Sequence, residues 1–330
     1  MFWELLLRLF LPVASFGPSS PEAMTLSTDS VPVVDSVAVE VYSPQRTPFE
    51  VRFGEAESGY RVMAMFVLPN QAIPVAVANP TEDFALEATA GQTWKTGIAA
   101  WTWVAPAKPG VYPMEIRQRG SEQGMTLNVF VMVPYSAMRR GSIDGYRIGN
   151  YPRPRSEFYA RPEGFVQVTP DMMDIQVSPH FRLAQFLCKQ GGGPPEYLVL
   201  RQPLLVKLEQ LLAQVNERGR EAHTFSLMSA YRTPSYNAAI GNVTTYSRHS
   251  YGDAADIFVD DDGDGQMDDL NGDGRHSLAD ARWLGAIVNE TQGAPEFAGL
   301  TGGLGTYEPT HSHGAFVHVD VRGFEARWGT

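Results

Sequence analysis

The chain has one cysteine, Cys188, among its 330 residues. A single cysteine cannot form a disulfide within the chain, and it excludes a structural zinc site built mainly from cysteines. Cys188 ends the run Phe-Arg-Leu-Ala-Gln-Phe-Leu-Cys, whose apolar residues follow a helical pattern, so we expect a buried core thiol and assign it no nucleophilic role. The cysteine count leaves the cellular compartment open.

An excess of positive charge is lacking as well. The 26 lysines and arginines are outnumbered by 37 aspartates and glutamates, which gives a formal net charge of -11. Binding of nucleic acid depends on clustered lysines and arginines that neutralise phosphates, so this composition argues against nucleic acid as the main partner. Aspartates crowd residues 253–280, where a bound metal ion would neutralise part of the charge.

A long hydrophobic run is missing from the N-terminus. Residues 1–16 are apolar apart from Glu4 and Arg8, which makes the run too short and too charged for a membrane span. The run resembles a signal peptide that lacks the positively charged start. We predict a signal or anchor segment at residues 1–30 and a location in the periplasm or cell envelope. A misassigned start codon or an amphipathic stretch is the alternative.

The length of the chain and its apolar share of 43% suit two domains with ordinary cores. Short alternating apolar runs separated by turn residues predict an antiparallel β-sandwich at residues 31–136. Its tryptophans, Trp94, Trp101 and Trp103, suit core packing, with a sugar-binding face as the alternative. Examples of the predicted strands are residues 36–42, 60–68, 73–78, 101–104 and 125–133.

Residues 137–175 are rich in arginine, proline, glycine and tyrosine and show no sustained period. We interpret them as a linker laid across the surface. The arginines, as in the run Tyr-Pro-Arg-Pro-Arg at residues 151–155, suit either a solvated connector or contact with an acidic glycan.

Periodic segments follow the linker. Apolar residues at helical spacing predict a core helix that starts near Pro203 and ends before Gly219. A strand at residues 224–228 and a short helix at residues 234–240 come next. The end of this strand delivers Arg232 to a position where a rigid scaffold holds the side chain.

The stretch Ser-Arg-His-Ser-Tyr-Gly-Asp-Ala-Ala-Asp at residues 247–256 places His249 seven residues before Asp256. The small residues Gly252 and Ala254 between them suit a turn that leads into a strand and lets the backbone pass close to an ion. An imidazole nitrogen and a carboxylate oxygen together suit zinc. The spacing therefore predicts two ligands of one metal site.

The pattern SxHxxGxAxD in this stretch resembles the zinc D-alanyl-D-alanine carboxypeptidases and hedgehog-type metallopeptidases, which cut bacterial cell-wall peptides. Residues 316–323, Phe-Val-His-Val-Asp-Val-Arg-Gly, resemble the family's strand with the third zinc ligand, here His318. Residues 229–237, Ser-Ala-Tyr-Arg-Thr-Pro-Ser-Tyr-Asn, resemble the segment in which an arginine faces the substrate, here Arg232. The resemblance implies an α+β zinc peptidase domain at residues 176–330, with Ser247 also at the substrate.

Strand alternation supports this site. The side chains of His318 and Asp320 share one face of their strand, so Asp320 should lie near the metal and orient a ligand, or else form a surface ion pair with Arg322. Two strands that each offer a ligand, together with His249 from a loop, predict three ligands and an open position. Zinc in such a site lowers the pKa of a bound water to about 7 and polarises a carbonyl, which implies peptide-bond hydrolysis.

The chain departs from the family at the general base. Relatives place an acidic residue three positions before the last histidine, or another histidine two positions before it, where this chain has Ala315 and Phe316. Proton transfer must then come from elsewhere, and we choose His313, whose pKa range suits the task, with Asp320 as a second catalytic candidate. The departure also allows a catalytically silent metal-binding domain. The other candidates are His311 and Glu308.

An acidic loop follows the Asp256 strand. Residues 269–280 resemble an EF-hand loop of the dockerin kind, in which alternate oxygen ligands wrap calcium and a glycine, here Gly274, makes the sharp turn. A second series begins at residue 260 but overlaps the first, so one site or two sites with shared ligands are expected. The alternative is a flexible loop in which Ser277 and Asp280 cap the next helix. The predicted calcium ligands are Asp260, Asp262, Asp264, Asp269, Asn271, Asp273 and Asp280.

These features together predict a zinc-dependent hydrolase of peptidoglycan stem peptides, either a D-alanyl-D-alanine carboxypeptidase or an endopeptidase. The sandwich would serve as a targeting or spacing module, and calcium would have a structural role. The alternative is a cell-envelope binding protein that zinc and calcium stabilise and that has lost catalysis.

Overall fold

Alternating apolar residues build two sheets in the first part of the computed structural model, which describes residues 41–54, 56–242 and 244–329. The first sheet has the strand order β2-β1-β4-β7-β6, and the second has the order β3-β9-β8-β5. The strands are β1 (Arg46–Phe53), β2 (Ala56–Tyr60), β3 (Val62–Val67), β4 (Ala72–Val77), β5 (Phe84–Ala88), β6 (Gln92–Gly97), β7 (Ala100–Val104), β8 (Gly110–Gln118) and β9 (Gly124–Val131).

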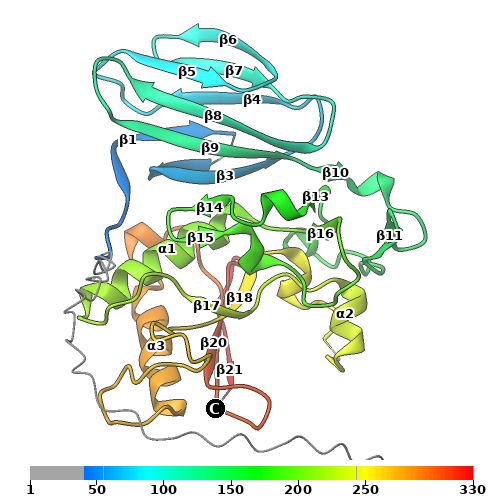
Figure 1. The fold of residues 1–330 in the computed structure, drawn as a ribbon, viewed down its shortest axis with the longest axis vertical. Coiled ribbons are helices and arrows are strands. Elements are labelled where there is room, and N and C mark those ends of the chain that lie inside the picture. The colour runs from blue at the N-terminus through cyan, green and yellow to red at the C-terminus, as the bar shows by residue number, and fades with distance from the viewer. Residues whose placement is uncertain (1–40, 55, 243, 330) are drawn as a thin grey trace, which may run out of the picture. The chain divides into compact units, whose positions relative to one another are not determined.

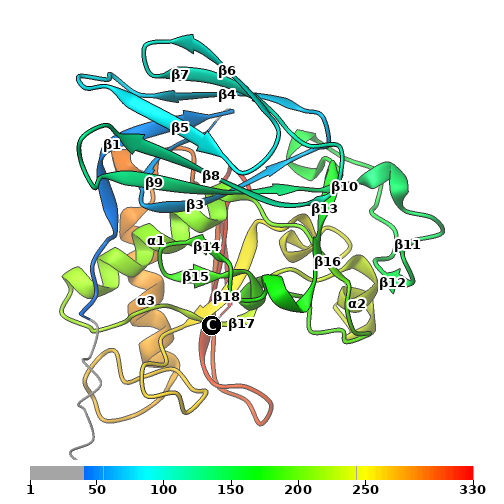
Figure 2. The same ribbon diagram turned by 45° about the horizontal axis from the view of Figure 1, so that its top comes forward.

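The two sheets pack face to face (Figures 1 and 2). Every second residue of the central strands points inward and is buried, as with Val75 of β4 and Leu127 of β9. Trp101 and Trp103 are buried in this core, whereas Trp94 on the edge strand β6 is exposed. The predicted antiparallel sandwich is corrected at one pair, because strands β3 and β9 pair in parallel, while the other pairs in the two sheets are antiparallel.

The prediction of a surface linker at residues 137–175 is corrected by the structure. Ile148, Tyr151 and Phe165 of this segment are buried. The sequence did not reveal this burial, because the apolar residues of the segment follow neither a helical nor a strand period. Strand β13 (Gly164–Val168) pairs with β10 (Val133–Pro134) on one side and with β16 (Glu196–Leu198) on the other. The described residues therefore form one compact unit, with no division at this segment.

Short strands and 3-10 helices lie within this segment and directly before and after it. These are η1 (Tyr135–Ala137), β11 (Ser142–Ile143), β12 (Tyr146–Arg147), η2 (Glu157–Tyr159), η3 (Pro170–Met172), β14 (Gln176–Ser178), β15 (Phe181–Arg182) and η4 (Leu183–Phe186). Cys188 follows η4 and is buried, as expected for a core thiol. Asn128 of β9 donates a hydrogen bond to the carbonyl of Gln176 at 2.8 Å, which joins the sandwich to the second part of the chain.

The second part is built on a sheet with the order β17-β18-β20-β19-β21. Helix α1 (Gln202–Glu217) buries its leucine stripe, and α3 (Leu278–Thr291) packs on β19, β20 and α1 (Figure 1). Helix α1 confirms the predicted core helix, α2 (Pro234–Ala239) confirms the predicted short helix, and α3 is the helix expected after the acidic loop. The strands are β17 (Ser226–Ser229), β18 (Ala254–Phe258), β19 (Gly303–Tyr307), β20 (Phe316–Asp320) and β21 (Ala326–Gly329), with η5 (Arg248–Tyr251) and η6 (Pro295–Phe297) between them.

The fold is therefore mixed α+β and rich in strands. None of the helices in the described part of the chain is long and apolar enough to cross a membrane. The predicted signal or anchor segment at residues 1–30 lies outside the described residues.

A buried lysine joins α1 to the sheet. Lys207 donates hydrogen bonds from Nζ to the carbonyl oxygens of Leu300 at 3.0 Å and Asp320 at 2.9 Å. Burial lowers the pKa of this amine to about 8, because the charged form loses its hydration.

This shift predicts a pH-dependent stability. Between about pH 8 and the ordinary pKa of 10.5, the folded state binds fewer protons at Lys207 than the unfolded state, so the contribution of Lys207 to stability rises with pH. We expect the unfolding free energy of the wild type to rise relative to that of Lys207→Met by up to about 1.4 kcal/mol for each pH unit in this range.

Urea unfolding at four values between pH 7.5 and 10 measures this difference. The exposed lysine variant Lys189→Met is the control and should follow the wild type. A Lys207→Met difference that stays constant with pH would contradict the expected shift.

Candidate metal centre

Three elements deliver the predicted zinc ligands to one point. His249 lies in η5, Asp256 in β18 and His318 in β20. Asp256 and His318 are direct partners in an antiparallel pair, so their side chains project from the same face of the sheet. Gly252 ends η5 in the left-handed conformation and turns the chain from His249 into β18.

The ligand atoms of these residues lie in mutual contact. His249 Nε2 is 3.2 Å from His318 Nδ1 and 3.3 Å from Asp256 Oδ1, and the last two atoms are 2.8 Å apart. Ligands at about 2.0–2.1 Å from a tetrahedral zinc are separated by roughly 3.3 Å. The spacing therefore suits a zinc ion, and all three side chains are buried.

The remaining ring nitrogens determine which tautomers face the site. His249 Nδ1 lies 2.7 Å from the carbonyl oxygen of Ala230, and His318 Nε2 lies 3.1 Å from a carboxylate oxygen of Asp320. Each of these nitrogens must donate, which leaves an electron pair on the nitrogen that points toward Asp256. Two imidazole nitrogens and a carboxylate oxygen then meet without a hydrogen between them, an arrangement that suits a divalent cation.

The same contacts perturb the ionisation of the three groups. Burial lowers the pKa of His249. Burial also opposes a charge on His318, but its hydrogen bonds to Asp256 and Asp320 outweigh this effect and raise its pKa. Burial disfavours the Asp256 carboxylate, yet the adjacent His249 and His318 hold its pKa well below the usual range. A proton on His318 can thus take the place of a cation between these atoms.

Asp320 orients His318 and does not have the free oxygen that a proton acceptor needs. One of its oxygens accepts from His318, and the carboxylate also accepts from the Gly303 amide at 2.8 Å and from Arg322 Nε at 2.9 Å. The side chain is fully buried. These contacts support the predicted orienting role and the ion pair with Arg322 together, and they argue against Asp320 as a catalytic base.

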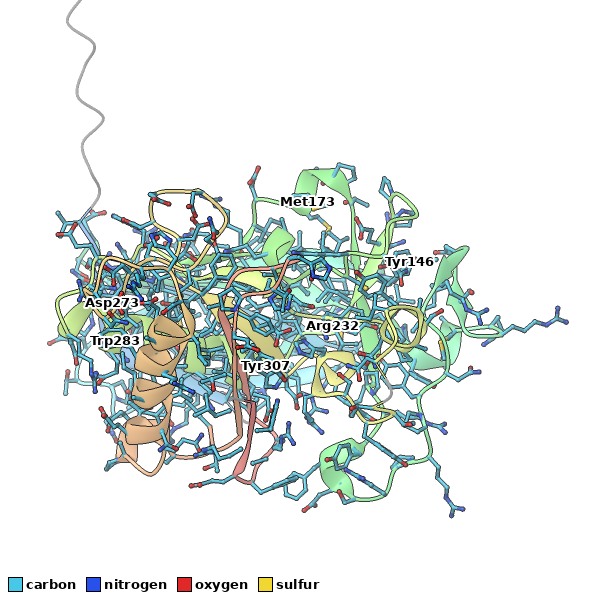
Figure 3. All side chains as sticks on the ribbon, turned by 90° about the horizontal axis from the view of Figure 1, so that it is seen from below. Tyr146, Met173, Arg232, Asp273, Trp283 and Tyr307 are labelled. Atoms are coloured by element: carbon cyan, nitrogen blue, oxygen red, sulfur yellow. The ribbon has the colours of Figure 1, made fainter. Side chains whose placement is uncertain are left out.

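Arg232 reaches the site from the end of β17. Its Nη2 donates to Asp256 Oδ2 at 2.5 Å, and its Nε donates to Ser229 Oγ at 2.6 Å. The guanidinium thus fixes the second oxygen of a predicted metal ligand and still lines a cavity beside it. Figure 3 shows Arg232 near the sheet that carries the site, together with Tyr307.

A cavity of about 690 Å³ opens beside the three ligands. Ser247, predicted to contact the substrate, lines it, but His313, His311 and Glu308 are not among its lining residues. The His313 ring instead contacts the edge of Phe316, and its Nδ1 lies 2.8 Å from the Gly314 carbonyl. The lining residues are Arg155, Tyr159, Arg232, Asn242, Thr244, Thr245, Tyr246, Ser247, Arg248, His249, Asp256, Tyr307, Phe316, His318, Arg322 and Trp328.

The sequence analysis missed an aromatic wall of this cavity. The centres of the Trp328 and His318 rings lie 5.0 Å apart, and Trp328 Nε1 donates to the Tyr307 hydroxyl at 2.7 Å. A Cβ at Gly305 would lie 2.5 Å from the indole, so this glycine is needed to let the ring lie across β19. The run Gly-Gly-Leu-Gly at residues 302–305, unusual inside a strand, is the signal that could have indicated a close approach.

The acidic loop has two series with similar backbone contacts. Asp269 accepts from the Gly274 amide at 2.7 Å, and Asp280 accepts from the Leu270 amide at 2.9 Å. In the series that begins at residue 260, Asp260 accepts from the Gly265 amide at 3.2 Å, and Asp268 accepts from the Asp261 amide at 3.0 Å.

Only part of the predicted calcium set is brought together. Carboxylate oxygens of Asp260, Asp262 and Asp268 lie within 4.8 Å of one another. Among the described residues, Asp269, Asp273 and Asp280 form no such group. Asp264, Asn271 and Asp273 each accept from a backbone amide two residues further on, and Ser277 with Asp280 forms the predicted capping box of α3. Asp268, which completes the series that begins at residue 260, was not predicted as a ligand.

The fold and site define a mixed α+β protein with a buried cluster of two histidines and one aspartate at the face of a sheet. No family model matches the chain, and a search of the curated proteins also found no match.

The turn between His249 and Asp256 can be tested by substitution. A Cβ at Gly252 would lie 2.3 Å from the Val199 carbonyl oxygen, at a φ of +69°, whereas a Cβ at Gly241 meets open space at a φ of +77°. Gly241→Ala should cost only the left-handed strain of about 1–2 kcal/mol. We expect Gly252→Ala to cost at least about 2 kcal/mol more in urea unfolding, because backbone atoms must move. Equal costs would contradict this account of the turn.

Proposed function

We propose that the chain is a zinc-dependent peptidase that hydrolyses peptide bonds in peptidoglycan stem peptides, as a D-alanyl-D-alanine carboxypeptidase or an endopeptidase. The observation that carries the proposal is the convergence of His249, Asp256 and His318 at the wall of a cavity. Three protein ligands with room for another are typical of catalytic rather than structural zinc. The resemblance of the surrounding motifs to zinc D-alanyl-D-alanine carboxypeptidases points to the substrate class.

The residues around the cluster suit this chemistry. Zinc held by the three ligands would polarise a carbonyl and lower the pKa of a water molecule. Arg232 holds Asp256 in place and presents its guanidinium to the cavity. Burial raises the pKa of Tyr307, and its hydroxyl already accepts from Trp328, so its own proton is available to a substrate oxygen that gains negative charge.

The proton-transfer group is a separate part of the proposal. His313 stays the predicted general base, although its ring does not line the cavity and contacts it only through the lining residue Phe316. Asp256 is the one carboxylate among the described residues that line the cavity, and Arg232 and His318 already engage it. This favours the second candidate function, a catalytically silent binding protein of the cell envelope that zinc and calcium stabilise.

We also propose calcium as a structural ion of the loop at residues 260–280. The convergence of Asp260, Asp262 and Asp268 and the oriented oxygens of Asp269 and Asp280 support it. A bound ion would hold the end of β18 and the start of α3. The periplasm or cell envelope is the proposed location, since the proposed substrate is found there.

The zinc proposal predicts both binding and activity. The purified protein should hold one zinc per chain by mass spectrometry of the metal and should shorten muropeptide stem peptides. His249→Ala and His318→Ala should each lower kcat/KM by at least about a thousandfold, because the metal supplies several kcal/mol of transition-state stabilisation. His276→Ala, an exposed histidine elsewhere, is the matched control.

The outcomes separate the two candidate functions. Activity that survives His249→Ala or His318→Ala would exclude this site as the catalytic centre. Zinc bound in the wild type without hydrolysis of any muropeptide would favour the binding protein.

The calcium proposal predicts a gain in thermal stability. At a calcium concentration about 100-fold above Kd, one site stabilises the folded state by about 2.7 kcal/mol, so Tm should rise measurably by calorimetry and fall again with a calcium chelator. Asp260→Ala and Asp269→Ala should each reduce the rise, whereas the exposed Asp171→Ala should not. A Tm that does not respond to calcium would contradict a structural ion here.

A further inference from the structure

The cavity at the metal centre is cationic, although the whole chain carries a net charge of -11. Four arginines line it, namely Arg155, Arg232, Arg248 and Arg322, against one carboxylate among the described lining residues. A divalent ion at the cluster would add to this positive charge. A cavity of this kind attracts an anionic ligand.

Three of these arginines are neutralised within the protein. Arg232 pairs with Asp256, and Arg322 pairs with Asp320, in each case at 2.5 Å. Arg248 pairs with the buried Asp253, with Nε 3.0 Å from Oδ1, and its Nη1 donates to the Phe158 carbonyl at 2.6 Å. The charges of these three arginines therefore stabilise the site through ion pairs within the protein.

Arg155 differs from the other three. Among the described residues it has no carboxylate within 4.0 Å. Its guanidinium carbon lies 4.2 Å from the ring centre of Tyr159 and 4.4 Å from that of Tyr246, and its Nη2 donates to the Tyr159 hydroxyl at 2.7 Å. The two rings hold the Arg155 guanidinium in place, while its other N–H groups stay available to a ligand.

The rings are themselves anchored. The Tyr246 hydroxyl donates to the Arg153 carbonyl at 2.9 Å, and the rings of Tyr159 and Tyr246 meet edge to face with centres 5.1 Å apart. A guanidinium that is fixed in advance loses less conformational entropy when it binds a ligand. Arg155 is exposed, so the N–H groups that the rings do not engage can be reached by a ligand while the rings hold the guanidinium in place, an arrangement suited to recognition.

We propose that Arg155 binds a carboxylate of the substrate and so determines which peptides the cavity accepts. The inference rests on the proposed function, since it takes the ligand of this cavity to be a peptide. A guanidinium can bind a carboxylate through two parallel N–H···O bonds. Stem peptides offer two sources of this group, the C-terminal carboxylate and the α-carboxylate of the γ-linked glutamate.

Four forms of one peptide separate these sources. L-Ala-γ-D-Glu-L-Lys-D-Ala-D-Ala is made with its C-terminus free or amidated and with its glutamate α-carboxylate free or amidated. The last peptide bond is replaced by a ketomethylene group, so that binding is measured apart from hydrolysis. The Kd of each form for the zinc-loaded protein is measured by fluorescence anisotropy.

Arg155→Gln should weaken binding at least tenfold for forms that keep the recognised carboxylate, and it should not affect forms in which this carboxylate is amidated. The amidated form whose Kd no longer changes with Arg155→Gln identifies which of the two carboxylates Arg155 binds. Arg155→Lys keeps the charge but not the fork and should fall between the wild type and Arg155→Gln. Arg153→Gln, an exposed arginine of the same segment that does not line the cavity, is the matched control.

The proposal is overturned if Arg155→Gln leaves every Kd unchanged, if it weakens all four forms equally, or if the wild type binds none of them. Muropeptide hydrolysis by the wild type is measured in parallel. Carboxylate-selective binding without hydrolysis would support the role of Arg155 and contradict the peptidase, whereas hydrolysis without selectivity would contradict only the role of Arg155.

Discussion

Three electron-pair donors are held in mutual contact inside the protein, and the rest of the second half is organised around this constraint. His249, Asp256 and His318 place two nitrogens and an oxygen within 3.3 Å of one another in a buried position. Such atoms repel unless a cation or a proton lies between them. The site therefore couples the fold to a bound positive charge.

A second layer of contacts keeps the ligands from relaxing apart. The Ala230 carbonyl accepts a hydrogen bond from His249 Nδ1, and the Asp320 carboxylate accepts one from His318 Nε2. Arg232 donates to the second carboxylate oxygen of Asp256. Lys207 in turn holds the Asp320 carbonyl from helix α1. The site and the hydrophobic core thus share residues, so the cluster of His249, Asp256 and His318 and the packing of α1 depend on the same contacts.

Much of the site could be read from local spacing. A strand period of two puts His318 and Asp320 on one face, and the small Gly252 marks the turn that follows His249, whereas the register that sets His318 opposite Asp256 comes from the pairing of β18 with β20. Residues 137–175 could not be read in this way, because their buried residues follow no period. Tyr159 and Arg155 of that segment reach the cavity only because β13 is inserted between β10 and β16. The aromatic wall of Trp328 and Tyr307 depends on the parallel pairing of β21 with β19, and the glycines at residues 302–305 indicate only that a group approaches closely, not which ring it is.

By itself the sequence determined the alternating strands, the core helices and the residue types at the His249, Asp256 and His318 positions, because these depend on side-chain chemistry and on spacing within one element. The tertiary structure alone decided which nitrogens point inward, which arginines are neutralised and what lines the cavity. Those properties arise from contacts between residues far apart in the chain, as between Arg232 and Asp256 or between Trp328 and His318. No local period records such contacts, because packing rather than chain spacing creates them.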